Sequence, residues 1–182
     1  ADDVLIEKYL EGQEISTHEL IGALHKGILE TRIFPVVCAA AGKEGLGADR
    51  VLDMIVDELP APPELGPWSG VDSATGEETE IGLHEDGPAI VYVFKTLADQ
   101  FSGKINLLRV ISGTLASDTQ VIDTRTGNKE RIGHLMRLQG KDHDLVDELG
   151  PGDIGAVAKL KDVTTGDVLT TGASNVVLRP VA

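Results

Sequence analysis

Short apolar runs separated by glycine turns fill residues 88–169, and this pattern constrains the fold more than any other feature of the sequence. The runs at 89–95 (AIVYVFK), 105–111 (INLLRVI) and 154–157 (IGAV) are rich in β-branched side chains. Strands of this length, separated by turns at intervals of about ten residues, are typical of a small antiparallel barrel or sandwich. The sequence therefore predicts an antiparallel β-barrel over 88–182.

The alternation of side chains along these runs predicts the interior of the barrel. A hairpin is expected around the turn at 126–128, between strands at 121–123 and 131–138, with alternate residues from Ile132 to Leu138 on one side. A register error of one residue exchanges the inward and outward sets, so the choice between Val91 and Tyr92 stays open. The interior is expected to contain one of these two, together with Leu107, Val110, Ile132, Ile154 and Val157.

The first part of the chain has a helical pattern instead. Residues 2–10 are predicted to form a short helix, and a second helix is predicted over 17–27. Ser16 and Glu19 have the spacing of a capping box, in which each side chain accepts a hydrogen bond from the other residue's backbone N–H. This signature marks where the second helix begins.

A strand, a loop and a third helix are expected next. The apolar run at 33–38 (IFPVVC) suits a strand buried on both faces, as in a parallel sheet. A small-residue loop over 39–47 leads to a helix over 49–59, with Asp49 as its cap. A single strand cannot make a sheet, so residues 1–60 are interpreted as the C-terminal remnant of a larger α/β domain.

These patterns divide the chain into three parts: an α/β remnant over 1–60, a linker and the start of the barrel over 61–87, and the barrel over 88–182. The proline-rich stretch 60–67 (PAPPELGP) is predicted to be a stiff, extended linker. Because the chain ends directly after the apolar residues 176–178, we expect it to be a piece of a longer protein.

Charge excludes one class of function. The formal net charge is −14 and aromatic residues make up 3%, whereas proteins that wrap nucleic acid need clustered Lys and Arg, and base-stacking platforms need aromatic rings. Any nucleic-acid contact is therefore expected to be local and made by loops. No signal peptide or membrane span is expected, and the single cysteine, Cys38, fits a reducing cytoplasm.

No catalytic or metal-binding set stands out. The glycine-containing loop at 42–45 is not a phosphate-binding loop of the form G-x-x-x-x-G-K-[ST], and Cys38 is expected to be an inert core residue. We predict no catalytic residue and no metal site, and we expect the turns at 152–154 and 164–167 to serve first as turns. Four of the five histidines are considered as metal ligands and lack the spacing for it: His18, His25, His134 and His143.

The order of several short phrases resembles a known family. F-x-G-K at 101–104, R-V-x-S-G-T-L at 109–115, G-D-I at 152–154 and T-T-G-D at 164–167 resemble the second domain of elongation factor G. The resemblance implies a mixed fold, with the end of a GTPase domain followed by a β-barrel of the translation-factor domain II type.

The N-terminal part carries the same resemblance. The segments 7–12 (EKYLEG), 35–41 (PVVCAAA) and 51–62 (VLDMIVDELPAP) are similar to the end of the elongation factor G GTPase domain. In that family the loop after the last strand is the fifth guanine-nucleotide motif, usually G-S-A followed by lysine, and its backbone N–H contacts the guanine. The matching positions are Ala39, Ala40, Ala41 and Lys43. Alanine replaces the serine here, and the loop is about one residue longer, which indicates a divergent paralogue.

The resemblance also implies partners. GTP and Mg²⁺ are expected for the longer protein but not for this piece, since the phosphate loop, the switches and the N-K-x-D motif lie outside it. The expected partner is the ribosome, contacted at its RNA by loops. A dimer formed through the exposed α/β remnant is a further expectation. The contact candidates are Gly152, Asp153, Thr164, Thr165, Gly166 and Asp167.

Three readings of function follow. The first is a fragment of an elongation-factor-G-like translational GTPase, acting in the cytoplasm on the ribosome in protein synthesis, at translocation or a related step. The second is a ribosomal protection or release-type factor. The third is a plain β-barrel interaction module without a nucleotide connection.

Overall fold

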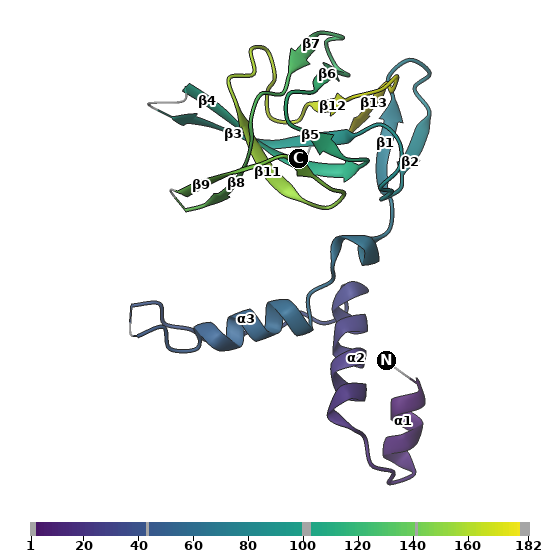
Figure 1. Ribbon diagram of the computed structural model, residues 1–182. Coiled ribbons are helices and arrows are strands. Elements are labelled where there is room, and N and C mark those ends of the chain that lie inside the picture. Colours follow the sequence, from purple (N-terminus) through teal and green to yellow (C-terminus); the bar gives the residue numbers. More distant parts are fainter. Residues whose placement is uncertain (1–2, 43, 100–102, 141, 179–182) are drawn as a thin grey trace. The chain divides into compact units, whose positions relative to one another are not determined.

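The computed structural model describes residues 3–42, 44–99, 103–140 and 142–178. It divides into an N-terminal unit, residues 1–65, and a second unit, residues 66–182. The helices belong to the first unit and the strands to the second, as Figure 1 shows. Each unit is described below by itself.

The predicted helices of the N-terminal unit are confirmed. They are α1 (Asp3–Leu10), α2 (Thr17–Leu29) and α3 (Ala48–Asp57), followed by a short 3-10 helix, η1 (Pro62–Leu65). Gly12 follows α1 with φ at 71°, in the left-handed region that glycine adopts without strain. The expected extended linker at 60–67 is wrong in part, since η1 occupies its centre.

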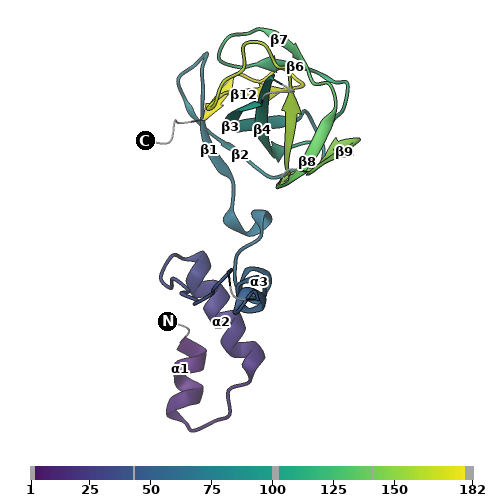
Figure 2. The same ribbon diagram turned by 90° about the vertical axis from the view of Figure 1, so that its left-hand side faces the viewer.

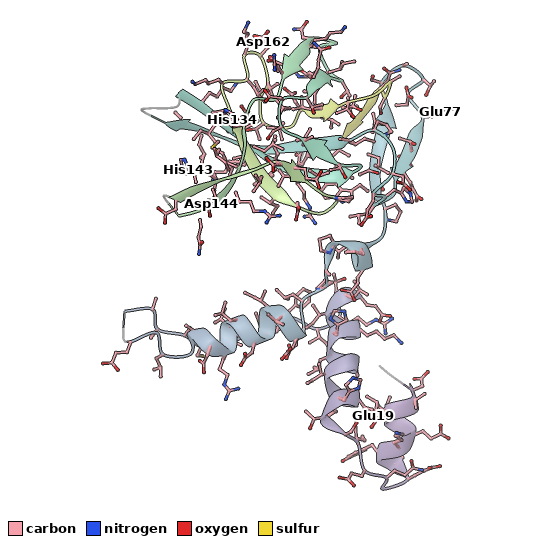
Figure 3. All side chains as sticks on the ribbon, in the orientation of Figure 1. Glu19, Glu77, His134, His143, Asp144 and Asp162 are labelled. Carbon is pink, nitrogen blue, oxygen red and sulfur yellow. The ribbon has the colours of Figure 1, made fainter. Side chains whose placement is uncertain are left out.

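The capping box is also confirmed, and it joins two helices. Glu19 donates its backbone N–H to Ser16 Oγ at 3.3 Å, and its carboxylate accepts from the Ser16 N–H at 3.0 Å. The same carboxylate accepts from the ammonium of Lys8 on α1, and Figure 3 shows Glu19 on the side of α2 that faces α1. Lys8, and then Ser16, lower the pKa of Glu19 to about 2.

This pKa makes the attachment of α1 to α2 sensitive to acid. Because the folded pKa lies below the unfolded value of about 4.3, the stabilisation is complete above that pH and is lost as the pH falls towards about 2. We expect Glu19→Gln to loosen α1 at neutral pH as acid does in the wild type. Amide exchange of α1 measures this, with the exposed Glu14→Gln as control; equal protection in all three proteins would contradict it.

The predicted strand at 33–38 is wrong, because residues 33–39 adopt no regular structure. Phe34 is 75% exposed and Val36 89% exposed. A strand needs neighbouring strands to satisfy its N–H and C=O groups, and the described residues of this unit supply only the isolated bridge between Ala40 and Leu46. Cys38 is accordingly exposed rather than a core residue.

The beginning of α3 also differs from the prediction. Its N-cap is Gly47, not Asp49, and Gly47 has φ at 77° and no side chain to cap the helix. A Cβ at Gly47 would lie 2.6 Å from the carbonyl oxygen of Cys38. The close approach of these two backbone segments therefore requires glycine at the N-cap.

The second unit is antiparallel throughout, in agreement with the predicted strand class. An eight-stranded sheet has the order β7-β6-β12-β3-β4-β11-β8-β9, beside a three-stranded sheet β13-β1-β2 and the pair β10-β5. Figure 2 shows the large sheet curving around β3 and β4. The strands are β1 (Trp68–Asp72), β2 (Glu78–Ile81), β3 (Ile90–Asp99), β4 (Gly103–Ser112), β5 (Leu115–Ala116), β6 (Gln120–Asp123), β7 (Lys129–Arg131), β8 (Leu135–Gln139), β9 (Asp142–Val146), β10 (Glu148–Leu149), β11 (Ile154–Ala158), β12 (Val168–Thr170) and β13 (Val176–Leu178).

The core of this unit uses one face of the long strands. Val91 points inward and is fully buried, whereas Tyr92 is half-buried. Val110, Ile132 and Val157 are buried as predicted. The predictions for Leu107 and Ile154 are wrong.

The register explains both errors. On β4 the core residues are Leu108 and Val110, so Leu107 points to the other face and is half-buried. On β11 the core residue Val157 lies three positions from Ile154, and an odd spacing puts the two side chains on opposite faces. Ile154 is 56% exposed.

The predicted hairpin at 121–138 is correct only in its first half. β6 pairs with β7 around the turn at 126–128, but the chain leaves the ladder at residues 132–134 and begins a new strand, β8, that pairs with β9 and β11. Ile132 is therefore buried while His134 is exposed.

Candidate functional site

The loop between β11 and β12, residues 159–167, is anchored by Asp167. This carboxylate is 3% exposed and accepts hydrogen bonds from the Thr164 N–H at 2.7 Å and its hydroxyl at 3.0 Å. Arg125 donates to both its oxygens, from Nε at 2.6 Å and Nη2 at 2.9 Å. Asp167 is thus the closing residue of the turn, as its place in T-T-G-D predicts.

Electrostatics hold Asp167 in its charged form. Burial acts to raise the pKa of Asp167, but the Arg125 guanidinium and the two donors of Thr164 outweigh it and hold the pKa below its usual value. Arg125 also lies 3.6 Å from the carboxylate of Asp123, which is 1% exposed. One half-exposed guanidinium therefore balances two buried carboxylates.

Further contacts fix the 159–167 loop to its surroundings. The Lys104 ammonium donates to the carbonyl of Val163, and Lys104 accepts at its own carbonyl from the Lys159 N–H at 3.0 Å. Glu130 accepts from the backbone N–H groups of residues 161 and 162 at 3.2 and 3.0 Å. The loop therefore has a defined shape.

The outer surface of this loop is exposed. Thr164, Thr165 and Gly166 are exposed, as are Lys159 and Lys161. Neither lysine forms an ion pair with another residue in the described part of the chain. The Thr164 and Thr165 hydroxyls already donate to Asp167 and Thr96, so the two lysine ammonium groups are the donors that can reach an anion such as phosphate. Asp162 directly follows Lys161 in sequence and is labelled in Figure 3.

The lysines were not among the residues predicted from the sequence. The signal was available: two lysines close before the T-T-G-D phrase, in a chain with 16 basic and 30 acidic residues. In a chain this acidic, two lysines close together indicate a place that can attract an anion.

A buried polar group lies under this loop. Thr165 Oγ1 lies 3.1 Å from Thr96 Oγ1, which also accepts from Asn106 Nδ2 at 3.0 Å. Asn106 is fully buried, and its Oδ1 has no hydrogen-bond partner among the described residues. A buried amide oxygen of this kind is normally satisfied by an ordered water.

The turn at 150–153 is the second predicted contact region. The Asp153 carboxylate accepts from the Gly150 N–H at 3.0 Å and from Arg137 Nη2 at 3.3 Å, and the Gly152 N–H donates to Val110 O at 2.8 Å. Gly152 and Asp153 are half-buried. Among the described residues, no hydrogen bond joins this turn to the 159–167 loop.

The predicted fifth guanine motif lies in the N-terminal unit. The Ala40 N–H donates to Leu46 O at 2.8 Å, so this backbone donor is already used within the loop. Ala39 and Ala41 are exposed. Lys43 lies outside the described residues, as do Phe101 and Ser102 of the F-x-G-K phrase.

Metal ligands do not gather anywhere in the part of the chain that the structure describes. Its residues contain no group of three or more His, Cys, Asp or Glu side chains that could hold a metal ion. None of the described helices is long and apolar enough to cross a membrane.

Comparisons with known proteins bear on the second unit and on the whole chain. Residues 88–172 match the family model described as elongation factor G domain 2. A solved structure of a protein from Thermus thermophilus is similar to 95% of this chain, with 30% sequence identity and a TM-score of 0.68. This chain spans 23% of that protein's length.

Proposed function

Because residues 88–172 match the family model described as elongation factor G domain 2, we propose that this chain is part of a translational GTPase that acts on the ribosome in protein synthesis, at translocation or a related step. The family match is the observation that carries this proposal. The likeness to a protein about four times as long supports a further proposal, that the GTPase activity belongs to a longer chain working in the cytoplasm.

The finer architecture is part of the proposal. We take residues 1–60 as the end of a GTPase domain, 61–87 as the connection and 88–182 as a closed β-barrel of the domain II type. The antiparallel order of the eight-stranded sheet supports the last assignment. The assignment of residues 1–60 is supported by the segment 33–38, which is exposed and forms no strand, since it lacks the neighbouring strands that a complete sheet would supply.

Guanine nucleotide and Mg²⁺ are proposed ligands of the longer protein. Ala39 to Ala41, with Lys43, would contribute backbone contacts to the guanine. Since the Ala40 N–H is bonded to Leu46 O, Ala39 and Ala41 are the better candidates for these contacts, or the loop must open. A dimer through the N-terminal unit is a separate proposal, supported by its exposed apolar residues such as Leu52 and Val56.

The contact with ribosomal RNA is assigned to the exposed part of the 159–167 loop. Of the six predicted contact residues, Thr164, Thr165 and Gly166 present accessible groups. Asp167 and Asp153 use their carboxylates inside the protein and hold the turns in shape. The lysines at 159 and 161 add the positive charge that RNA phosphates require.

We expect the double variant Lys159→Glu/Lys161→Glu to bind ribosomes about tenfold more weakly or worse. Removing two phosphate contacts should also reduce the slope of log K against log salt concentration by about 2. Sedimentation of the full chain with ribosomes across a salt series measures both quantities.

The control for charge alone is Lys129→Glu, since Lys129 is exposed on β7 and likewise makes no ion pair with a described residue. Because this single variant changes the net charge half as much as the double variant, half of the loss in log K would show a nonspecific effect of net charge. Wild-type protein that fails to sediment with ribosomes at low salt would favour a plain interaction module.

A further inference from the structure

His25 on α2 joins three elements of the N-terminal unit. Its Nδ1 lies 3.1 Å from the carbonyl oxygen of Glu58, at the C-terminal end of α3, and its Nε2 lies 2.8 Å from the carboxylate oxygen Oε1 of Glu64 in η1. The second oxygen of that carboxylate accepts from the Ala61 N–H at 2.6 Å. The His25 side chain is 25% exposed, so the ring is largely enclosed by these contacts.

The two partners of the ring have the same hydrogen-bonding character. A backbone carbonyl only accepts, and so does an ionised carboxylate. A neutral imidazole carries one N–H and can donate to only one of them, with the lone pair of its other nitrogen directed at an oxygen. Both hydrogen bonds form together only when the ring is an imidazolium.

We propose that His25 is a pH-sensitive clasp, closed as the imidazolium, that ties η1 to α2 and to the end of α3. Residue 66, where the second unit begins, follows η1 directly. The clasp therefore controls how firmly the last segment of the N-terminal unit is held. When the ring loses its proton, one of the two hydrogen bonds is lost and η1 gains freedom.

The charged groups around the ring favour this assignment. The carboxylate of Glu64 faces it from η1. α3 contributes the Glu58 carbonyl, in the negative end of the helix dipole. No ion pair joins His25 to a charged residue of α2 in the described part of the chain.

The direction of the pH dependence follows from these groups. The closed state binds a proton that the open state releases, so its stabilisation is present at low pH and is lost as the pH rises and the ring gives up that proton. The Ala61 N–H, and then His25, hold the pKa of Glu64 below its usual value. The carboxylate consequently stays charged until strongly acidic pH. Its protonation there sets the lower end of the pH range over which the clasp is closed.

Amide exchange of Ala61 and Glu64 in the full chain, corrected for intrinsic rates, measures the clasp across about pH 5 to 9, a range that brackets the histidine titration. Both amides bond within 61–64. In the wild type we expect their protection to fall roughly tenfold as the ring deprotonates, the order of one charge-assisted hydrogen bond. Nitrogen NMR of the imidazole should show both ring nitrogens protonated in the protected state.

Three variants make the test specific. His18→Gln, at an exposed histidine of the same helix, should keep the wild-type profile. His25→Gln should give a low protection that no longer changes with pH. Glu64→Gln should keep much of its protection at high pH, because an amide N–H can donate to the bare Nε2 of a neutral ring while Nδ1–H still donates to Glu58.

Each alternative outcome is decisive. A pH profile unchanged by His25→Gln would overturn the proposal. So would a wild-type imidazole that stays neutral at about pH 5.5, below the ordinary histidine pKa, with residues 61–64 fully protected. Loss of protection in Glu64→Gln at every pH, with α2 still helical, would contradict the assignment of hydrogen-bond donors and acceptors to the two ring nitrogens.

Discussion

Replacing Arg125 by methionine should lower the free energy of unfolding of the second unit by about 2–3 kcal/mol at neutral pH. Removing the partner of a buried charge typically costs about 3–5 kcal/mol, and the lower figure allows for solvent screening, since the Arg125 side chain is 50% exposed. The Asp167 and Asp123 carboxylates, 3% and 1% exposed, would remain without their counter-ion.

The pH dependence of this loss has a definite sign. In the wild type, the lowered pKa of Asp167 contributes stability above the unfolded value of about 3.9, and that contribution is lost as the pH falls. In Arg125→Met, burial continues to raise the pKa of Asp167 while the guanidinium no longer lowers it. The stability difference between the two proteins should therefore be largest near neutral pH and shrink below about pH 4.

Urea unfolding followed by tryptophan fluorescence measures this in the full chain, because the single tryptophan, Trp68, lies in the second unit. Arg131→Met is the matched control: Arg131 pairs at 3.2 Å with Asp118, and both side chains are exposed. It should change stability by less than about 0.5 kcal/mol. Equal losses of stability in both variants would show that Arg125 acts through side-chain packing or through the unfolded chain, and not through its charge.

Leu108→Ala should destabilise the second unit by about 3 kcal/mol, within the range measured for buried leucines. Leu108 is fully buried and belongs to the cluster that contains Val91, Val110 and Val157. Truncation removes buried apolar surface and leaves a cavity. The strands around the cavity are held by their hydrogen-bonded pairing and do not move in to fill it.

The control for this prediction tests the register of β11. Ile154 lies directly across from Arg109 and points outward, so Ile154→Ala should cost less than about 0.5 kcal/mol. The same tryptophan signal reports both variants. A loss at Ile154 comparable to that at Leu108 would mean that the inward face of the sheet has been assigned wrongly.

Prediction from the sequence succeeded where the determining contacts are close in the chain. The capping box needs only Ser16 and Glu19, three residues apart, and the β6–β7 hairpin needs only its own turn. The T-T-G-D turn is similar, since Thr164 donates to Asp167. Such contacts form with little loss of chain entropy, so local residue types suffice to predict them.

Prediction failed where a segment depends on partners elsewhere. The apolar run 33–38 has the composition of a buried strand. A strand forms only where neighbouring strands accept and donate its backbone hydrogen bonds, and the described residues offer no such neighbour there. The candidate contact loop was found by its turn, whereas the exposure of Lys159 and Lys161 depends on how the loop is tied to Lys104 and Glu130.

The sequence by itself determined the three helices, the antiparallel class of the long strands and the turns at 126–128 and 164–167, because period and turn chemistry act over a few residues. The tertiary structure alone decided that Val157 faces the core while Ile154 faces solvent, since register is set by pairing with β4 and β8. It also decided the charge balance of Asp167 with Arg125, 42 residues away, and the meeting of His25 with Glu64, 39 residues away. Only the folded chain brings these groups within hydrogen-bonding distance.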